Sequence, residues 1–206
     1  MAEPRSGQDR IALPFVAFTV TYMVAGWAAQ AALRPLNLRR ETSELLRLRE
    51  SMPQVTPAEL RHAYTLLHNL TTALSLAQGP IYVALLGVAL WGFVRLAGAR
   101  WAFRGALRAS VVAGAALVAR QIALFAGAAL TDLARVDSPD QLSLSPARYV
   151  NPDSQSMALL SSLDVFSLVL VALLAFAIVR TTTLSRRQAV GVAVLSWGVW
   201  LVPKVL

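Results

Sequence analysis

Long apolar runs, separated by shorter polar segments, set the pattern of this chain. Five of the runs are roughly twenty residues long and nearly free of charge, and a helix of about that length crosses the ~30 Å hydrocarbon core of a bilayer. A helix also satisfies its own backbone hydrogen bonds, as a single stretch in lipid must. The pattern therefore predicts an all-α, polytopic integral membrane protein that folds as one domain over residues 1–206, with five transmembrane helices at about 11–33, 76–97, 109–130, 159–179 and 188–206.

Only a short basic segment separates the last two apolar runs, and it holds Arg180, Arg186 and Arg187. Arginines beside an apolar run settle at the membrane surface, where lipid headgroups attract them. We therefore expect this part of the chain to form a membrane helical hairpin with its turn held at one surface.

The segment 34–74 is the longest stretch outside the runs, and it divides into two amphipathic pieces at Pro53, because the residue before a proline disfavours helix. The second piece opens with Thr56, Pro57 and Glu59, which is the pattern of a capping box with proline at the first helical position. We expect two extramembrane amphipathic helices here. They can lie in the membrane interface, cover the bundle or offer a docking surface to a partner.

Two of the interior spans carry further signals. Pro80, near the start of the second span, begins or kinks that helix because it cannot donate to the previous turn. The third span is rich in small residues, and Ser110 and Gly114 form a small-xxx-small pair that lets a neighbouring helix approach closely. That neighbour can belong to the same chain or to a second copy, and the sequence leaves both open.

Polar side chains inside the apolar runs are the candidate functional residues. Arg120 and Gln121 lie near the middle of the third run, and Asp164 lies about one turn inside the fourth, after Ser161 and Ser162. A charge at such a depth costs roughly 2.5–3.5 kcal/mol on insertion scales and normally faces the bundle interior or water. The expected depths of Arg120 and Asp164 differ by roughly 9 Å, most of which a long arginine side chain can span. The two interpretations are an ion pair inside the bundle and a substrate or ion path.

Composition agrees with lipid exposure, since 56% of the residues are hydrophobic and the mean hydropathy is +0.56. The net charge of +8 comes largely from arginines just outside the apolar runs, which fits lipid headgroups better than nucleic acid. The absence of cysteine excludes disulfides, thiolate metal ligands and cysteine nucleophiles. His62 and His68 fall on different faces of a helix, whereas a zinc site needs three or four ligands. We therefore predict no metal site and no cofactor.

Two dense arginine clusters, at 95–108 and 180–187, surround the shortest loops. Basic residues in short loops stay in the cytoplasm, and an arrangement of five spans puts both loops on the side of the N-terminus. This predicts a cytoplasmic N-terminus and a C-terminus outside, with 11–33 as a retained span and not a cleaved signal peptide.

Several short motifs follow one another in a defined order. They are Gly98, Phe103–Leu107, Asn151-Pro152, Ala158–Phe166 and Leu184–Ala189. This order resembles the prokaryotic branch of the Yip family of five-span membrane proteins, whose eukaryotic relatives interact with Ypt/Rab GTPases. The resemblance implies the plasma (inner) membrane of a prokaryote and a role in membrane organisation or trafficking. The chain departs from the family pattern in two places. The acidic-leucine-tyrosine-glycine-proline motif of the eukaryotic branch is absent, so we do not expect this chain to bind a GTPase. Gly98-Ala99-Arg100 stands where the prokaryotic branch has a glycine pair.

No nucleophile–base pair, metal constellation or phosphate-binding loop is recognisable in the sequence, so we expect a protein that is not an enzyme. The favoured hypothesis is a Yip-type integral membrane protein that organises or modulates a membrane complex, or membrane trafficking or export. The alternative is a transporter or channel component, such as an accessory subunit of an export system, that uses Arg120 and Asp164. The expected partners are the lipid bilayer and a membrane protein or a second copy of the chain, and not nucleic acid.

Overall fold

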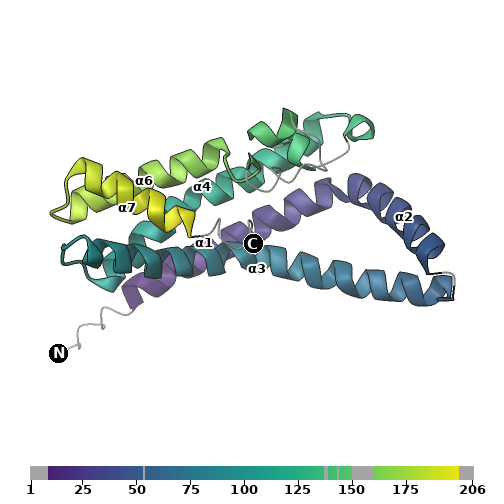
Figure 1. The fold of residues 1–206 in the computed structure, drawn as a ribbon, viewed down its shortest axis with the longest axis horizontal. Helices are drawn as coiled ribbons and strands as arrows, with labels where there is room; N and C mark the ends of the chain where they lie inside the picture. The colour runs from purple at the N-terminus through teal and green to yellow at the C-terminus, as the bar shows by residue number, and fades with distance from the viewer. Residues whose placement is uncertain (1–8, 53, 137–138, 143, 150–159, 200–206) are drawn as a thin grey trace, which may run out of the picture.

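The computed structural model of the chain consists of helices and their connections (Figure 1). It describes residues 9–52, 54–136, 139–142, 144–149 and 160–199, and no strand occurs among them, which confirms the all-α class for this part of the chain. The helices are α1 (Asp9–Ala32), α2 (Arg34–Ser51), α3 (Pro57–Leu96), α4 (Phe103–Leu130), α6 (Val165–Thr181) and α7 (Arg186–Gly198). Between α4 and α6 lie three short 3-10 helices, η1 (Leu133–Arg135), η2 (Pro139–Leu142) and η3 (Pro146–Tyr149).

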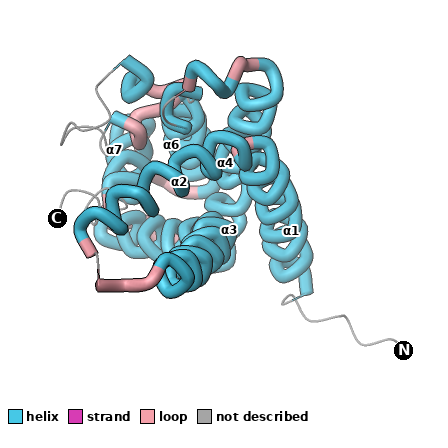
Figure 2. Tube along the Cα trace, turned by 90° about the vertical axis from the view of Figure 1, so that its right-hand side faces the viewer, coloured by secondary structure: helices cyan, strands magenta, loops and turns pink. Residues whose placement is uncertain are grey.

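The central helix of the bundle is α4, which lies among α1, α3, α6 and α7 (Figures 1 and 2). It packs against α1, α3 and α6, while α7 packs against α3 and α6. The buried face of α4 consists mainly of small side chains, among them Ala106, Ser110, Ala113 and Gly114. Small residues let helix backbones approach closely, which increases the dispersion contacts between helices.

Glycines at the helix contacts leave no room for a larger residue. A Cβ on Gly114 would lie 2.9 Å from the Phe18 ring and 2.9 Å from the Val83 side chain. A Cβ on Gly79, in α3, would overlap the ring of Tyr22. The neighbour of the small-residue face on the third apolar run is therefore observed within the chain.

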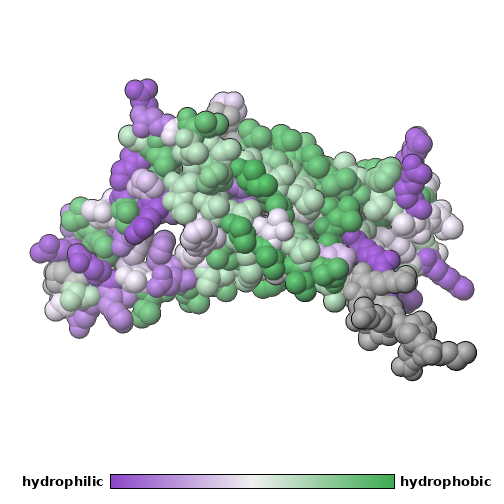
Figure 3. Space-filling view, turned by 180° about the vertical axis from the view of Figure 1, so that it is seen from behind, coloured by the Kyte–Doolittle hydropathy of each residue, from purple (hydrophilic) through white to green (hydrophobic). Residues whose placement is uncertain are grey.

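Three of the described helices, α1, α3 and α4, are long and apolar enough to cross a membrane. The apolar helix α6 has 17 residues, and α7 has 13. Figure 3 shows an apolar zone along the middle of the molecule, with hydrophilic side chains gathered toward its two ends. Because such an extensive apolar surface is unusual for a protein exposed to water, these helices suggest a membrane-embedded protein.

The largest departure from the expected elements is α3, a single helix of 40 residues. The sequence predicts an amphipathic piece that ends near residue 74 and a separate span from residue 76. No helix breaker lies between the two, however, and Leu74 and Leu76 are good helix formers. Pro80 lies inside α3 without ending it. At ~1.5 Å per residue α3 is about 60 Å long, roughly twice the thickness of a bilayer's hydrocarbon core.

The predicted capping box forms at the start of α3. The Glu59 N–H donates to Thr56 Oγ1 at 3.3 Å, and the Thr56 N–H donates to Glu59 Oε2 at 3.0 Å. The Thr56 hydroxyl donates to the same carboxylate oxygen at 2.7 Å. These hydrogen bonds lower the pKa of Glu59, because they favour its ionised form. The stabilisation of α3 by this carboxylate is therefore present above the ordinary pKa of glutamate and lost as the pH falls through the lowered value.

A helical arm, made of α2 and residues 57–75 of α3, extends beyond the bundle (Figure 1). The two helices are joined across the arm by the Tyr64 hydroxyl, which donates to Glu44 Oε2 at 3.3 Å. At the base of the arm, the Arg39 guanidinium donates to three main-chain oxygens, those of Ala134 (3.0 Å), Val136 (3.3 Å) and Leu133. Arg39 thus fastens α2 to the connection that follows α4.

The last two helices differ from the predicted fourth and fifth spans at their ends. The helix α6 begins later than predicted, at Val165, because Asp164 is its N-cap. The helix α7 begins with a second capping box, formed by Ser185 and Gln188. The start of the predicted fourth span and the end of the fifth, residues 200–206, lie outside the described residues. The expected pairing of the two helices is observed, since α6 and α7 pack together.

Gly79→Ala is expected to destabilise the bundle by roughly 1–3 kcal/mol, the usual cost of over-packing a tight contact, because the added methyl overlaps the Tyr22 ring. Gly92→Ala is the matched control, since a Cβ at that position meets nothing within 4 Å. Thermal unfolding in a mild detergent, followed by circular dichroism, measures both variants. Equal unfolding midpoints would contradict the close contact described between α1 and α3.

Candidate functional site

Asp164 is a buried carboxylate at the start of α6, with 1% of its side chain exposed. Its Oδ1 accepts a hydrogen bond from the Ser167 N–H at 2.7 Å, and its main-chain oxygen accepts one from the Leu168 N–H at 3.2 Å. The predicted position of Asp164, one turn inside a helix, is therefore wrong, because this residue is the N-cap. The first turn of a helix has unsatisfied N–H groups and the positive end of the helix dipole, and both stabilise a carboxylate.

Arg120 of α4 supplies the opposite charge. Its Nε lies 2.8 Å from Asp164 Oδ2, and its Nη2 donates to the main-chain oxygen of Ser161 at 3.4 Å. The Nε–H is not aligned with Oδ2 as a hydrogen bond, so the contact is an ion pair held by electrostatic attraction. The two charged residues singled out from the sequence are thus brought together in an ion pair.

The two charges are buried unequally, because 33% of the Arg120 side chain is exposed, compared with 1% for Asp164. Each oxygen of the carboxylate has a separate role: Oδ1 caps α6 and Oδ2 faces the guanidinium. Removing an ion from water costs several kcal/mol, which only a close counter-charge and hydrogen bonds offset. The buried carboxylate therefore depends on Arg120 more than the guanidinium depends on Asp164.

A cavity of about 80 Å³ lies beside this ion pair. Its polar and aromatic lining consists of Tyr22, Gln78, Tyr82, Arg120, Ser162, Ser167 and Trp197. At ~30 Å³ for each water molecule, a space of this size holds about two or three. Residues from α1, α3, α4, α6 and α7 meet at this point. The candidate site is therefore the polar junction of the whole bundle.

Gln121 belongs to a second polar contact at the same junction. Its Nε2 donates to the Tyr22 hydroxyl at 3.1 Å, and Tyr22 lines the cavity. The ring of Tyr22 also fills the space left by Gly79. A single tyrosine of α1 thus connects that helix to both α3 and α4.

The candidate residues from the sequence all lie in or beside this junction. Ser161 contributes its main-chain oxygen to Arg120, and Ser162 is buried at the cavity wall. The sequence analysis does not single out Gln78 or the three aromatic residues of the lining. Gln78 carries a usable signal, since it is a polar side chain in an apolar run. The aromatic residues are indistinguishable in sequence from ordinary membrane-interface residues, and only helix packing gathers them.

Among the described residues, no group of three or more His, Asp or Glu side chains lies close enough to hold a metal ion. His62 and His68 both belong to the part of α3 that forms the arm. The chemistry of the junction rests on its ion pair and its hydrogen bonds.

Arg120→Leu and Asp164→Asn are expected to destabilise the protein to different extents. Arg120→Leu leaves a buried carboxylate without its counter-charge, which costs about 3–5 kcal/mol. Asp164→Asn keeps a good N-cap residue and leaves a partly exposed guanidinium, so the expected cost is only about 1–2 kcal/mol. The double variant should regain most of the stability that Arg120→Leu loses. Unfolding midpoints in detergent measure this cycle, and simple addition of the two losses would contradict a direct interaction.

No protein-family model matches this chain, and no curated protein or solved structure matches it either. The resemblance to the Yip family therefore rests on the sequence motifs alone. Two pieces of those motifs, Asn151-Pro152 and Ala158-Leu159, lie outside the described residues. The structure explains why glycine occupies position 98, since the φ of 86° at Gly98, just after α3, is a left-handed conformation that favours glycine.

Proposed function

We propose that this chain is a non-enzymatic, five-span integral membrane protein of the Yip type, which organises or modulates a membrane complex in trafficking or export. The observation that carries the proposal is the helical arm, which projects from an apolar bundle (Figure 1). The outer part of this arm, away from the bundle, stands clear of the lipid and can reach the soluble surface of a membrane-bound partner.

The exposed surface of the arm combines apolar and charged side chains. Leu46, Leu66 and Leu67 are 57%, 57% and 62% exposed, and arginines and glutamates accompany the leucines along α2. Apolar side chains within a polar surround are typical of protein interaction sites. The partner that fits this surface is another membrane protein or a second copy of the chain.

The arm is also connected to the bundle by regular structure, because α3 continues without a break from the arm into the bundle. Arg39 ties the other helix of the arm, α2, to the connection that follows α4. Binding at the arm would therefore act on a well-packed bundle through two attachments. This arrangement supports a role in modulating a complex.

The polar junction supports the same proposal. Both side-chain oxygens of Asp164 are engaged within the bundle, and the neighbouring cavity has room for about two or three water molecules at ~30 Å³ each. These features favour a structural role for Arg120 and Asp164, in which they hold α4 against α6.

For the membrane arrangement, we propose that α6 and α7, together with the residues adjoining them, form the fourth and fifth spans. The start of α1, the α3–α4 connection and the α6–α7 connection lie at one end of the bundle (Figure 1). Arginines cluster around these connections: Arg95, Arg100, Arg104, Arg108, Arg180, Arg186 and Arg187. By the positive-inside rule this end faces the cytoplasm of a prokaryote, and the arm faces outward.

A second candidate function is a transport component, such as an accessory subunit of an export system. One observation favours it, the polar cavity beside Arg120, because polar residues inside a membrane bundle often mark ion or substrate pathways. The two functions differ in the behaviour of Asp164→Asn. A variant that stays folded but loses an export phenotype would favour the transport function.

The proposed orientation is tested with single cysteines, since the chain contains none. Ser43→Cys, on the arm, should react with a membrane-impermeant maleimide in intact cells. Thr183→Cys, in the α6–α7 connection, should react only after permeabilisation. Both positions are exposed. The reverse pattern would overturn the orientation, and labelling of both in intact cells would contradict an odd number of crossings between them.

Affinity capture from membranes in a mild detergent tests the proposed role. The tagged protein should recover a membrane-protein partner in stoichiometric amount. The double variant Leu46→Ser/Leu67→Ser should reduce that recovery about tenfold, which corresponds to about 1.4 kcal/mol of binding free energy. Leu130→Ser is the matched control, since Leu130 is 88% exposed but lies outside the arm. Recovery of the folded protein without a partner or second copy would contradict the proposal.

A further inference from the structure

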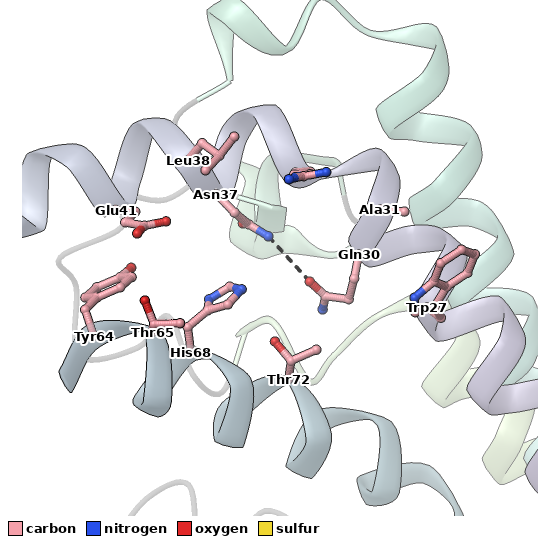
Figure 4. Close-up of a pocket in the computed structure, with 11 residues that line it drawn as sticks. Trp27, Gln30, Ala31, Asn37, Leu38, Glu41, Tyr64, Thr65, His68 and Thr72 are labelled. Atoms are coloured by element: carbon pink, nitrogen blue, oxygen red, sulfur yellow. Dashed lines mark hydrogen bonds between the residues drawn. The ribbon is translucent and has the colours of Figure 1, made fainter. Parts of the chain in front are cut away.

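A pocket of about 440 Å³, here called the wedge pocket, opens where the arm joins the bundle (Figure 4). The end of α1 and the first turns of α2 form one wall, and residues 64–72 of α3 form the other. Unlike the cavity at Arg120, the wedge pocket has space for a ligand larger than a few water molecules.

Arg34 and Glu41 place opposite charges along the α2 wall of this pocket. They lie close to two helical turns apart on one face of α2, about 10 Å along its axis. The ion pairs found among the described residues lie elsewhere, at Arg120 and Arg135. Within that part of the chain, no side chain forms a salt bridge with either pocket charge, so a ligand that carries both signs can satisfy both.

The facing wall, on α3, adds aromatic and hydroxyl groups. The rings of Tyr64 and His68 stack, with centroids 6.4 Å apart and planes 11° from parallel, and Figure 4 shows both rings and the Thr72 hydroxyl directed toward α2. Desolvation raises the pKa of Tyr64, and the charge of Glu44, its hydrogen bond with Tyr64 and the charge of Glu41 raise it further. An aromatic ring beside a carboxylate is a favourable environment for an ammonium group.

The position of the wedge pocket indicates where its ligand comes from. Trp27, which is 66% exposed, stands on the bundle side of the pocket (Figure 4), and tryptophan is enriched at the level of lipid headgroups. Between Trp27 and the charged residues, the Asn37 amide donates to Gln30 Oε1 at 3.5 Å. With α1 and α3 embedded as proposed, the pocket lies in the headgroup layer of the bilayer.

We propose that the wedge pocket binds the zwitterionic headgroup of phosphatidylethanolamine from the surrounding bilayer. The phosphate contacts Arg34 through charge-assisted hydrogen bonds, and the ammonium contacts Glu41 and the face of Tyr64. The acyl chains leave the pocket past Trp27. This inference rests on the membrane embedding that forms part of the proposed function.

Glu41 determines which class of headgroup fits. An anionic headgroup brings a negative charge with nothing to offset the Glu41 carboxylate, and like charges repel. A choline headgroup is also a zwitterion, but its quaternary ammonium has no N–H and cannot donate to Glu41, whereas an ethanolamine ammonium provides donors as a lysine ammonium does. Selectivity for ethanolamine over choline is therefore the signature of this site.

Native mass spectrometry of the full-length chain tests the proposal. The protein is released from nanodiscs that contain equal amounts of phosphatidylethanolamine, phosphatidylcholine and phosphatidylglycerol with identical acyl chains. Wild type should retain the ethanolamine lipid about tenfold over either competitor, the equivalent of one charge-assisted hydrogen bond. Arg34→Gln should lower the retention of all three lipids, whereas Glu41→Gln should lower the retention of the ethanolamine lipid relative to both competitors. Arg47→Gln and Glu50→Gln remove the same charges elsewhere on α2 and are the matched controls.

An unchanged ethanolamine-to-choline ratio in Glu41→Gln would overturn the proposal, as would equal effects of Arg34→Gln and Arg47→Gln. Soluble phosphoethanolamine separates the two sources of this headgroup. If it displaces the retained lipid at the same concentration, the pocket binds a soluble zwitterion and the lipid assignment is wrong. Alkaline extraction of native membranes, run in parallel, tests embedding alone. Release of the protein would contradict the proposed function, whereas an embedded protein without lipid preference would contradict only the pocket assignment.

Discussion

Burial of the Asp164 carboxylate is the constraint on which the rest of the bundle depends. A carboxylate that is 1% exposed needs a counter-charge and hydrogen bonds to offset its desolvation. The first turn of α6 provides a hydrogen bond from the Ser167 N–H, and Arg120 provides the charge. Because Arg120 lies on α4, the requirement fixes where the start of α6 meets α4. The requirement to stabilise the Asp164 carboxylate thus sets both where α6 begins and how α6 is positioned along α4.

Close packing at small residues holds the helices together in addition to the ion pair. If the helices are embedded in lipid as proposed, apolar burial supplies little net driving force, and their association depends on dispersion contacts and hydrogen bonds or ion pairs. Gly79 and Gly114 leave the space that the rings of Tyr22 and Phe18 occupy, where a Cβ would clash, and Tyr22 also receives a hydrogen bond from Gln121. Tyr22 therefore packs against α3 with its ring and accepts a hydrogen bond from α4 with its hydroxyl. This combination holds α1, α3 and α4 together at the polar junction.

The continuity of α3 connects this packed region to the outer part of the molecule. Its C-terminal half belongs to the bundle, and its N-terminal half forms one side of both the arm and the wedge pocket. A partner on the arm and a lipid in the pocket would contact the same helix, so either ligand would act on the orientation of the arm. The proposed organising role and the proposed lipid site are physically linked in this way.

The sequence by itself determined the helical class, the apolar runs that form α1, α4 and the C-terminal half of α3, the capping box of Thr56 and Glu59, and the charged residues Arg120 and Asp164 within apolar runs. These features follow from local pattern: the length of an apolar run, the spacing of Thr56 and Glu59, and the rarity of Arg120 and Asp164 in apolar surroundings. Only the tertiary structure decided that Asp164 caps α6, that the expected break near residue 75 is absent, and that aromatic residues gather at the junction. A helix end and a contact between distant segments depend on which neighbour satisfies a polar group. That neighbour is set by packing across the whole chain and leaves no local signature in the sequence.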